Sequence, residues 1–324
     1  MNAHLNLLKK LEDSFCSNNP RREKVLIKIL GYGEMSVVFE ILDNFNGYAY
    51  KRLAIFDEES QIERQIQAFK EYYRILTEKI GINTPPYEII WFRDRFEKIK
   101  FYYIQQKLPS ISIGNNAIHY LGENDIKNLV LLIMREMRKV WLFNQSNDRI
   151  KVGFDSQISN FAIENFNQNN SKIGTNSILI YLDTIPPFFR INGNEAMDIN
   201  LLLKTVPTFL KWILKINYIQ KIMKNVVNRY YDLRTTTIDL IANFSKEQKS
   251  DLIPALVKLV NNFFTQEASE LNIEPIYLNE VIKYYKHDRL IWIIYQYLRR
   301  VDKFMITKLF RRRYEFFLPP KIKR

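Results

Sequence analysis

The sequence predicts an α+β fold, in which a small antiparallel sheet of five strands with one packed helix precedes a mainly helical region. Two observations carry this prediction. The first third of the chain contains short β-prone runs joined by turn signals, and the last half is dominated by segments with apolar residues at helical spacing. With 324 residues, the chain is long enough to bury a sizeable core.

Five runs predict the strands of the sheet. Val25–Gly31 and Met35–Leu42 meet at two glycines, and an Asn-Gly turn signal in DNFNG precedes the third run, YAYKRLAIF. YEIIWF and IKFYYIQQ, separated by the polar turn RDRFEK, supply the last two strands. Between the third and fourth runs, Glu58–Ile80 contains no glycine or proline and repeats apolar residues at helical spacing, which predicts a helix.

The pattern changes after Pro109. A long amphipathic helix is predicted over Glu123–Asn144, followed by two β-prone pieces, NFAIEN and SILIYLD, on either side of an Asn-rich stretch. IPPFFR is expected to lead almost directly into helices, and the rest is expected to be helical with breaks near three prolines. These changes predict an N-terminal helical extension over 1–20, a sheet-plus-helix unit over 21–104, a connector over 105–109 and a helical unit over 110–324.

Charge and cysteine usage restrict the class of protein. The 48 Lys and Arg against 35 Asp and Glu give a net charge of +13, which favours an anionic partner such as a nucleotide, a phosphorylated molecule, an acidic lipid or a nucleic acid. Cys16 is the only cysteine, which excludes an intramolecular disulfide and a cysteine-based zinc site. The chain shows no secretory h-region and no bilayer-spanning run, so we expect a cytoplasmic protein without an integral membrane segment, with peripheral membrane contact left open.

A glycine pair marks the first candidate site. In ILGYGEMSVVFE, Gly31 and Gly33 lie where two predicted strands meet, and residues without a Cβ let a backbone approach a phosphate closely. An ordinary hairpin turn explains the same pair. The glycines alone therefore do not distinguish a phosphate-covering loop from a turn.

Lys51 is out of pattern on the third strand. Alternation places it on the face of Ala49 and Leu53, which is otherwise apolar, although a solvated lysine is the plain alternative. A buried ammonium requires a carboxylate partner. Glu71, near the middle of the following helix, is the expected partner, and Glu63 is the competing choice.

Three further polar residues lie in loops beside apolar runs. Asp155 and Asn160 are five positions apart in VGFDSQISNFAI, just before a β-prone run. Asp183 follows the apolar run of ILIYLDT at its C-terminal end. Each of the three is also explained as a turn or cap residue. A metal-ligand role is the functional interpretation of Asp183.

The order of these features resembles the protein-kinase-like superfamily: a glycine-rich hairpin, a strand lysine, a helix glutamate, an apolar connector, a D-x-x-x-x-N loop and a strand-end aspartate. The resemblance covers Val25 to Asp183. Within the superfamily, the chain looks most similar to the atypical, aminoglycoside-phosphotransferase-like branches. It implies a two-lobed fold, with an N-lobe over 21–104, a hinge over 105–109 and a C-lobe over 110–324. It also implies an ATP- and Mg²⁺-dependent phosphotransferase acting on a hydroxyl of an unidentified acceptor, such as a small or anionic molecule.

The resemblance implies a nucleotide-binding role for the first half of the motif set. Lys51, held by Glu71, would bind the α- and β-phosphates. Backbone and side chains of the hairpin would cover the phosphates, and the connector would pair with adenine; these residues are Gly31, Tyr32, Gly33, Ser36 and Val38 in the hairpin and Gln105, Lys107 and Leu108 in the connector.

The resemblance implies chemical roles for the second half. Asp155 would orient the attacking hydroxyl and accept its proton, while Asn160 and Asp183 would bind Mg²⁺. Two departures stand out. The loop histidine is absent from Gly153-Phe154-Asp155, and the D-F-G triplet reads Asp183-Thr184-Ile185 with no activation segment after it. The alternatives are therefore a pseudokinase-type regulatory or scaffolding protein and nucleotidyl transfer on the same fold.

The C-terminal stretch LRRVDKFMITKLFRRRYEFFLPPKIKR is basic and amphipathic. It suits contact with acidic lipid or an RNA backbone, and a solvated helix face is the alternative. The three histidines, His4, His119 and His287, have no His or Cys neighbour at ligand spacing, so a packed or surface role is expected for each.

Overall fold

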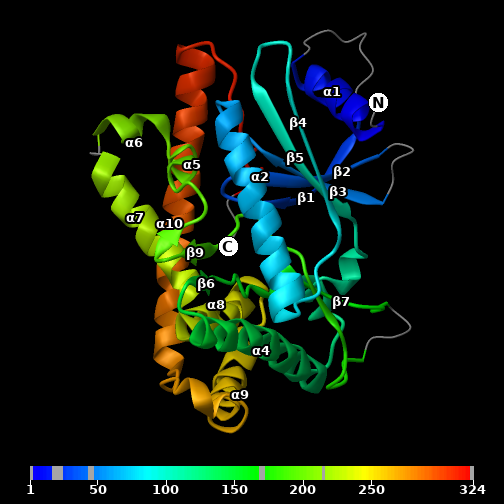
Figure 1. Ribbon diagram of the computed structural model, residues 1–324, viewed down its shortest axis with the longest axis vertical. Coiled ribbons are helices and arrows are strands. Elements are labelled where there is room, and N and C mark those ends of the chain that lie inside the picture. The colour runs from blue at the N-terminus through cyan, green and yellow to red at the C-terminus, as the bar shows by residue number, and fades with distance from the viewer. Residues whose placement is uncertain (1–2, 17–24, 43–46, 168–171, 214–215, 322–324) are drawn as a thin grey trace.

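The computed structural model describes residues 3–16, 25–42, 47–167, 172–213 and 216–321. It confirms the α+β class: an antiparallel sheet lies in the N-terminal part and helices dominate the C-terminal part (Figure 1). The sheet has five strands in the order β1-β2-β3-β5-β4. Their bounds are β1 Ile27–Tyr32, β2 Ser36–Ile41, β3 Tyr48–Leu53, β4 Tyr87–Arg93 and β5 Ile99–Gln106.

One helix covers each face of this sheet. α1 (Ala3–Cys16) packs Leu7, Leu8 and Leu11 against one face. α2 (Glu59–Arg74) packs Ile62 and Phe69 against the other face, and a π-helical turn, η1 (Ile75–Ile80), continues it. The two helices lie on opposite sides of the sheet in Figure 1. Burial of apolar side chains on both faces fixes the strand register, because a one-residue slip would exchange the two sets.

The C-terminal segment returns to the α1 face of the sheet. Arg52 of β3 pairs with Glu12 of α1 at 2.5 Å and with Glu315 at 3.1 Å, and Lys100 of β5 binds Glu315 at 2.6 Å. Arg313 joins Glu12 at 3.1 Å. A buried ionic network thus connects the two ends of the chain to two central strands.

The helical part surrounds α4 (Glu123–Ser146), whose buried face includes Leu129, Ile133, Met137 and Val140. α4 lies against α8 and α9, and α10 packs along α8. The remaining helices are α3 (Gly114–Ala117), α5 (Asn200–Leu203), α6 (Thr208–Ile213), α7 (Ile216–Asn228), α8 (Leu233–Lys246), α9 (Ile253–Gln266) and α10 (Leu278–Phe304). Short 3₁₀ or π turns are η2 (Ser110–Ser112), η3 (Ile158–Asn160), η4 (Arg229–Tyr231), η5 (Ser250–Leu252), η6 (Ser269–Leu271) and η7 (Met305–Leu309).

Two small sheets bring the loops of the helical part together. β7 (Phe161–Ile163) pairs with β8 (Leu179–Tyr181), as the two β-prone pieces predict. β6 (Ile150–Val152), β9 (Phe189–Ile191) and β10 (Asn194–Glu195) form the other. The expectation that IPPFFR leads into helices is wrong, since its end forms β9. Asn192 and Gly193 both have positive φ, at 50° and 79°, and this Asn-Gly turn closes a β9–β10 hairpin.

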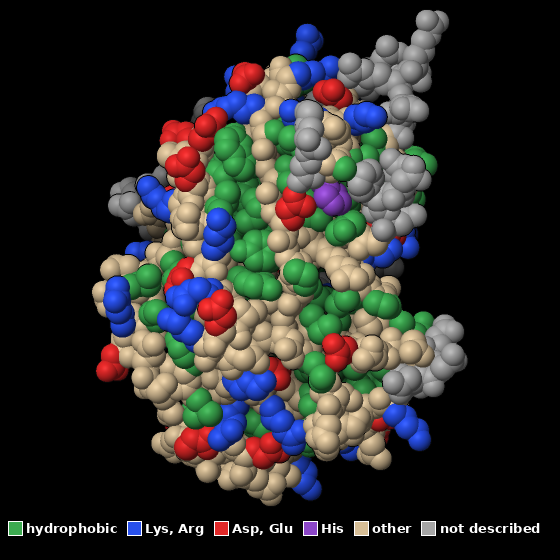
Figure 2. Space-filling model, turned by 45° about the vertical axis from the view of Figure 1, so that its right-hand side comes forward, with side chains coloured by type: hydrophobic (Ala, Val, Ile, Leu, Met, Phe, Trp, Pro, Cys, Tyr) green, Lys and Arg blue, Asp and Glu red, His purple; other side chains and the backbone are tan. Residues whose placement is uncertain are grey.

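The surface in Figure 2 mixes basic and acidic side chains, and hydrophobic side chains gather in its upper half. Among the residues that the structure describes, none of the helices combines the length and the apolar character needed to cross a membrane.

Candidate functional site

A cavity of about 480 Å³ brings the two halves of the predicted motif set together. The β1–β2 turn forms one wall, and the loops after β6 and β8 form another. The predicted residues that line it are Tyr32, Gly33, Ser36, Lys51, Asp155, Asn160 and Asp183.

The β1–β2 turn is tight. The Gly33 amide donates a hydrogen bond to the Ser36 carbonyl at 2.9 Å, and a Cβ on Gly33 would stand 3.0 Å from the Ser36 hydroxyl. A side chain at this position would therefore require the Ser36 hydroxyl to shift. At Gly31, where the register of β1 shifts, an added Cβ would meet no atom of the described residues within 4 Å apart from its chain neighbours, so packing among these residues does not explain this glycine.

Lys51 crosses the cavity from β3 to the loop after β8. Its Nζ lies 2.6 Å from the Asp183 carboxylate and 2.5 Å from the Ile185 carbonyl. The lysine side chain is 20% exposed and that of Asp183 is 25% exposed, so the ion pair is open to solvent on one side. This contact joins the sheet to the helical part at the cavity wall.

The expected ion pair between Lys51 and Glu71 is wrong in this structure. The Glu71 carboxylate binds Arg74 at 2.7 Å, which lowers the pKa of Glu71. The register of α2 explains the difference, because it turns Ala68, Phe69 and Tyr72 inward and leaves Glu71 on the solvent side. The competing choice, Glu63, is exposed as well.

Neighbouring elements brace the Asp155 loop in place of the missing histidine. The Tyr72 hydroxyl of α2 donates to the Gly153 carbonyl at 2.9 Å, and the Phe154 amide donates to the Tyr230 carbonyl at 2.8 Å. The Phe154 ring stacks on Tyr181 of β8, with 4.4 Å between centroids. The loop is thus positioned by contacts from far along the chain, which the local motif does not reveal.

Burial raises the pKa of Asp155 to about 7, and the neighbouring carboxylates of Asp239 and Asp183 act in the same direction. The positive charge of Arg229 opposes this rise. Asn160 donates its side-chain amide to the Asp155 carbonyl at 3.3 Å, which leaves its amide oxygen as the atom able to bind a cation. Asp155 and Asn160 are therefore oriented by the same loop.

Sequence reasoning missed Arg229 and Tyr230, which line the cavity beside Asp155. Arg229 donates to the Tyr230 hydroxyl at 2.9 Å, and its buried Nε has no hydrogen-bond partner among the described residues. The Tyr230 ring stacks on Phe188 at 4.3 Å. No local motif marks these residues, since the aromatic spacing around them is typical of a helical core.

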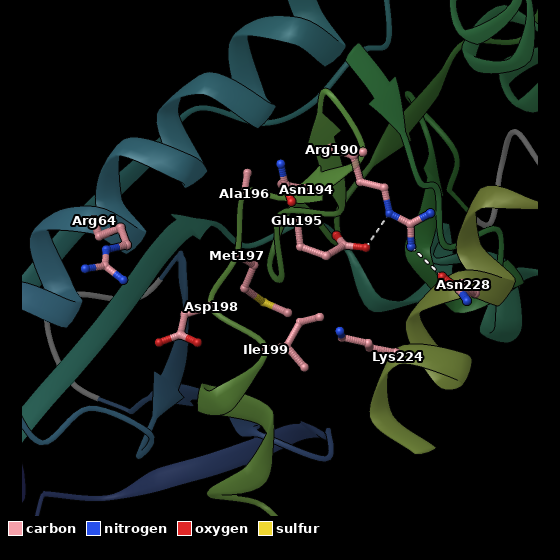
Figure 3. Close-up of a pocket in the computed structure, with 11 residues that line it drawn as sticks. Arg64, Arg190, Asn194, Glu195, Ala196, Met197, Asp198, Ile199, Lys224 and Asn228 are labelled. Atoms are coloured by element: carbon pink, nitrogen blue, oxygen red, sulfur yellow. Dashed lines mark hydrogen bonds and ion pairs between the residues drawn. The ribbon is translucent and has the colours of Figure 1, made fainter. Parts of the chain in front are cut away.

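A second cavity, of about 590 Å³, lies between α2, the β9–β10 hairpin and α7 (Figure 3). Residues of its wall contact η4, the turn that carries Arg229 and Tyr230. In Figure 3, Arg190 reaches toward Glu195 and Asn228, each at 2.5 Å. Glu195 also accepts a hydrogen bond from the Tyr231 hydroxyl at 2.8 Å, and the Arg190 guanidinium lies over the Tyr231 ring. The hairpin therefore fixes η4, which carries Arg229 and Tyr230.

The connector that is predicted to bind adenine does not line this cavity. Gln105, Lys107 and Leu108 are absent from the described residues that line the cavity, as are Gly31 and Val38 of the hairpin. The Lys107 amide already donates to the Gly47 carbonyl at 2.7 Å, and the Lys107 ammonium pairs with Glu40 of β2. The role of this connector toward a base stays a prediction.

The far side of the cavity is apolar and basic. α7 and α10 contribute Met223, Val227 and Trp292 to its wall, and the C-terminal segment contributes Pro319 and Lys321. Within the part of the chain that the structure describes, no group of three or more His, Cys, Asp or Glu residues is arranged as a metal site. Any cation at Asn160 and Asp183 would therefore need further oxygen ligands from a substrate or water.

Comparison with known proteins places this chain in a family. The model of a family of unknown function, DUF6206, matches residues 10–303. The chain belongs to this family. No curated protein matches the chain significantly.

Two solved structures are similar to the chain. One is titled WaaP in complex with acyl carrier protein, with 12% identity, a TM-score of 0.31 and coverage of 80% of this chain and 98% of that one. The other is the GDP complex of aminoglycoside 2′-phosphotransferase-IIIa, with 9% identity, a TM-score of 0.31 and coverage of 81% and 98%.

Proposed function

We propose that this protein is an ATP- and Mg²⁺-dependent phosphotransferase that transfers the γ-phosphoryl group to a hydroxyl of a small, anionic acceptor. The observation that supports it best is the convergence of Lys51, Asp155, Asn160 and Asp183 on one cavity beneath the β1–β2 turn. On this proposal, residues 21–104 form an N-lobe, 105–109 a hinge and 110–324 a C-lobe.

The nucleotide side of the proposal rests on the β1–β2 turn and Lys51. Backbone amides from Gly31 to Ser36 would face the phosphates, and the open space at Gly31 allows a close approach. Lys51 would exchange part of its contact with Asp183 for phosphate oxygens, which its partial exposure permits. Both groups supply positive electrostatic potential to the phosphates, which is the main task in phosphoryl transfer.

The residues present fit a magnesium ion. Mg²⁺ in such sites takes one or two protein oxygen ligands and completes its shell with phosphates and water, so the Asp183 carboxylate and the Asn160 amide oxygen are sufficient. When bound, the ion would neutralise the charge of the phosphate oxygens. Lys51 and Asn160 would keep the Asp183 carboxylate and the loop in position.

Asp155 suits a general base. Its carboxyl group is buried, has a pKa of about 7, and lies in the same cavity as Lys51 and Asp183. A base with this pKa is partly deprotonated at neutral pH and able to accept the proton of an acceptor hydroxyl. Arg229, beside it, would stabilise negative charge on the phosphoryl group during transfer.

The acceptor is proposed from the wall of the cavity. α7, α10 and the C-terminal segment enclose its far side with apolar groups, while Arg229, Lys246 and Lys321 add positive charge. An enclosed site favours a small molecule over an extended polypeptide, and these cations favour an anionic group on it.

The proposal is tested by incubating the purified protein with Mg²⁺ and ATP labelled at the γ-phosphate, with candidate acceptors or water. Label should leave ATP in the wild type and stay on ATP in Asp183→Ala. Asp251→Ala, at an exposed aspartate outside the cavity, is the matched control and should behave as wild type. A parallel incubation with ATP labelled at the α-phosphate separates the two reactions, because label from this position reaches an acceptor only in nucleotidyl transfer, and that result would overturn the proposal.

A nucleotide-binding regulatory protein is the second candidate. One observation favours it: the carboxylate partner of Lys51 is Asp183 instead of a residue of α2, so the lysine is oriented differently from the expected arrangement. This candidate predicts Mg²⁺-dependent nucleotide binding without transfer to any acceptor or to water.

A further inference from the structure

In the C-terminal half of α10, polar and charged side chains are buried and several apolar side chains are exposed. The inner face of this half buries Gln296, Arg299 and Asp302, which are 3%, 2% and 4% exposed. Arg299 donates to the Thr205 carbonyl at 2.5 Å, and Asp302 accepts a hydrogen bond from the Thr208 amide at 2.8 Å. Polar contacts therefore help to attach this half of the helix to the fold, and several of its large apolar residues are exposed.

The outward face carries a continuous apolar stripe at alternating spacings of four and three residues. Tyr297 and Phe304 in this stripe are 61% and 65% exposed. Such spacing places side chains on one face of a helix, and exposure of this much apolar surface indicates a binding site. The members of the stripe are Leu290, Ile294, Tyr297, Val301 and Phe304, and Leu309 and Phe310 extend it beyond the helix.

The charges around the stripe are all of one sign. From Lys283 to Arg312, each exposed charged side chain is basic. Among the residues that the structure describes, none of these side chains has an ion-pair or hydrogen-bond partner; they are Lys283, Lys286, Arg289, Lys303, Lys308, Arg311 and Arg312. The acidic side chains of this region face inward, such as Asp288 toward Arg229 and Asp302 toward Thr208. The mixed charges of the face in Figure 2 show that such segregation is not general to the surface.

We infer that this face of α10 and η7 docks on an anionic lipid surface. An apolar stripe with aromatic members and cations at both ends is the pattern of a helix that lies in a bilayer interface, with its apolar side in the acyl boundary and its cations at the headgroups. A second copy of the chain would bring the same unpartnered cations together, which disfavours it. A nucleic acid would leave the apolar stripe exposed. In Figure 1, α10 runs along one side of the fold, from the helical part to the level of the sheet.

Sedimentation of the full chain with vesicles tests the inference. One set of vesicles contains phosphatidylcholine alone, and the other contains added phosphatidylserine. The wild type should bind the anionic set, and binding should weaken with salt. Tyr297→Ser with Phe304→Ser should weaken binding at least about tenfold, and Lys286→Ala with Lys308→Ala should weaken it by roughly thirtyfold.

The matched controls lie away from α10. Phe96→Ser with Tyr120→Ser removes two equally exposed aromatic side chains, and Lys70→Ala with Lys258→Ala removes two exposed lysines. Both controls should bind as wild type, and circular dichroism should show the same helix content in all variants. Equal losses in the controls, absence of vesicle binding, or a dimer or RNA complex that depends on Phe304 without vesicle binding would each overturn the inference.

Discussion

Lys51 and Arg52 are neighbours on β3, yet their charges lie in different surroundings. Lys51 points into the cavity, is 20% exposed and pairs with Asp183 from a loop. Arg52 points to the opposite face, is 1% exposed and pairs with Glu12 and Glu315 from the two ends of the chain. The burial of Arg52 is complete, whereas one side of the Lys51 pair is open.

This difference separates a structural ion pair from a candidate functional one. Removal of one partner from a fully buried pair leaves a charge without compensation, which destabilises the fold strongly. A partly exposed pair is screened by water, so its loss costs little stability. The Lys51–Asp183 pair is therefore free to rearrange around a ligand, while the Arg52 network must stay intact.

The largest expected effect is on turnover in Asp183→Ala. Label transfer from ATP should fall by about a thousandfold, because the variant loses a proposed metal ligand and the orienting partner of Lys51. The free energy of unfolding should change by less than about 1 kcal/mol, measured by denaturant titration. A large loss of stability with unchanged specific activity would reverse the roles assigned to the two pairs.

Arg52→Ala should show the opposite pattern. The buried carboxylates of its network would be left short of a partner, so we expect a loss of about 3–5 kcal/mol in the free energy of unfolding. The fraction that stays folded should bind nucleotide as wild type does. Arg93→Ala, which breaks an exposed pair with Glu59, is the control and should cost no more than about 1 kcal/mol.

Asp155 predicts a pH dependence of both stability and activity. Its pKa rises from 3.8 to about 7 on folding, so between these values the folded chain retains a proton that the unfolded chain has lost. The free energy of unfolding should therefore fall as pH rises through this window, and Asp155→Asn should remove that fall. Turnover should rise through pH 7 as the base loses its proton. A flat stability profile in the wild type would contradict this assignment.

The smallest effect is expected at Glu71. Because its carboxylate pairs with Arg74 on the solvent side, Glu71→Gln should change the free energy of unfolding by about 0.5 kcal/mol or less and leave turnover within about twofold. An assay of label transfer from ATP measures turnover, and denaturant titration measures the free energy of unfolding. A loss comparable with that of Asp183→Ala would restore the expected partnership with Lys51.

Periodicity and turn chemistry predict the sheet and its flanking helices, because both faces of the sheet are covered by apolar residues. The β9–β10 hairpin was missed although Asn192-Gly193 carries a hairpin signal. At the site, motifs that a local spacing reveals supply Lys51, Asp155, Asn160 and Asp183. Arg229, Tyr230 and the bracing hydroxyl of Tyr72 come from elements whose placement depends on tertiary packing, as does the outward turn of Glu71.

Thermal unfolding with and without ATP and Mg²⁺, in the wild type and in Asp183→Ala, tests the central claim most directly. A ligand that binds only the folded state at one hundred times its dissociation constant adds about 2.7 kcal/mol of stability. We predict a rise in the unfolding temperature of the wild type that requires both ATP and Mg²⁺ and disappears in the variant. An unchanged unfolding temperature in the wild type with any nucleotide would contradict the account.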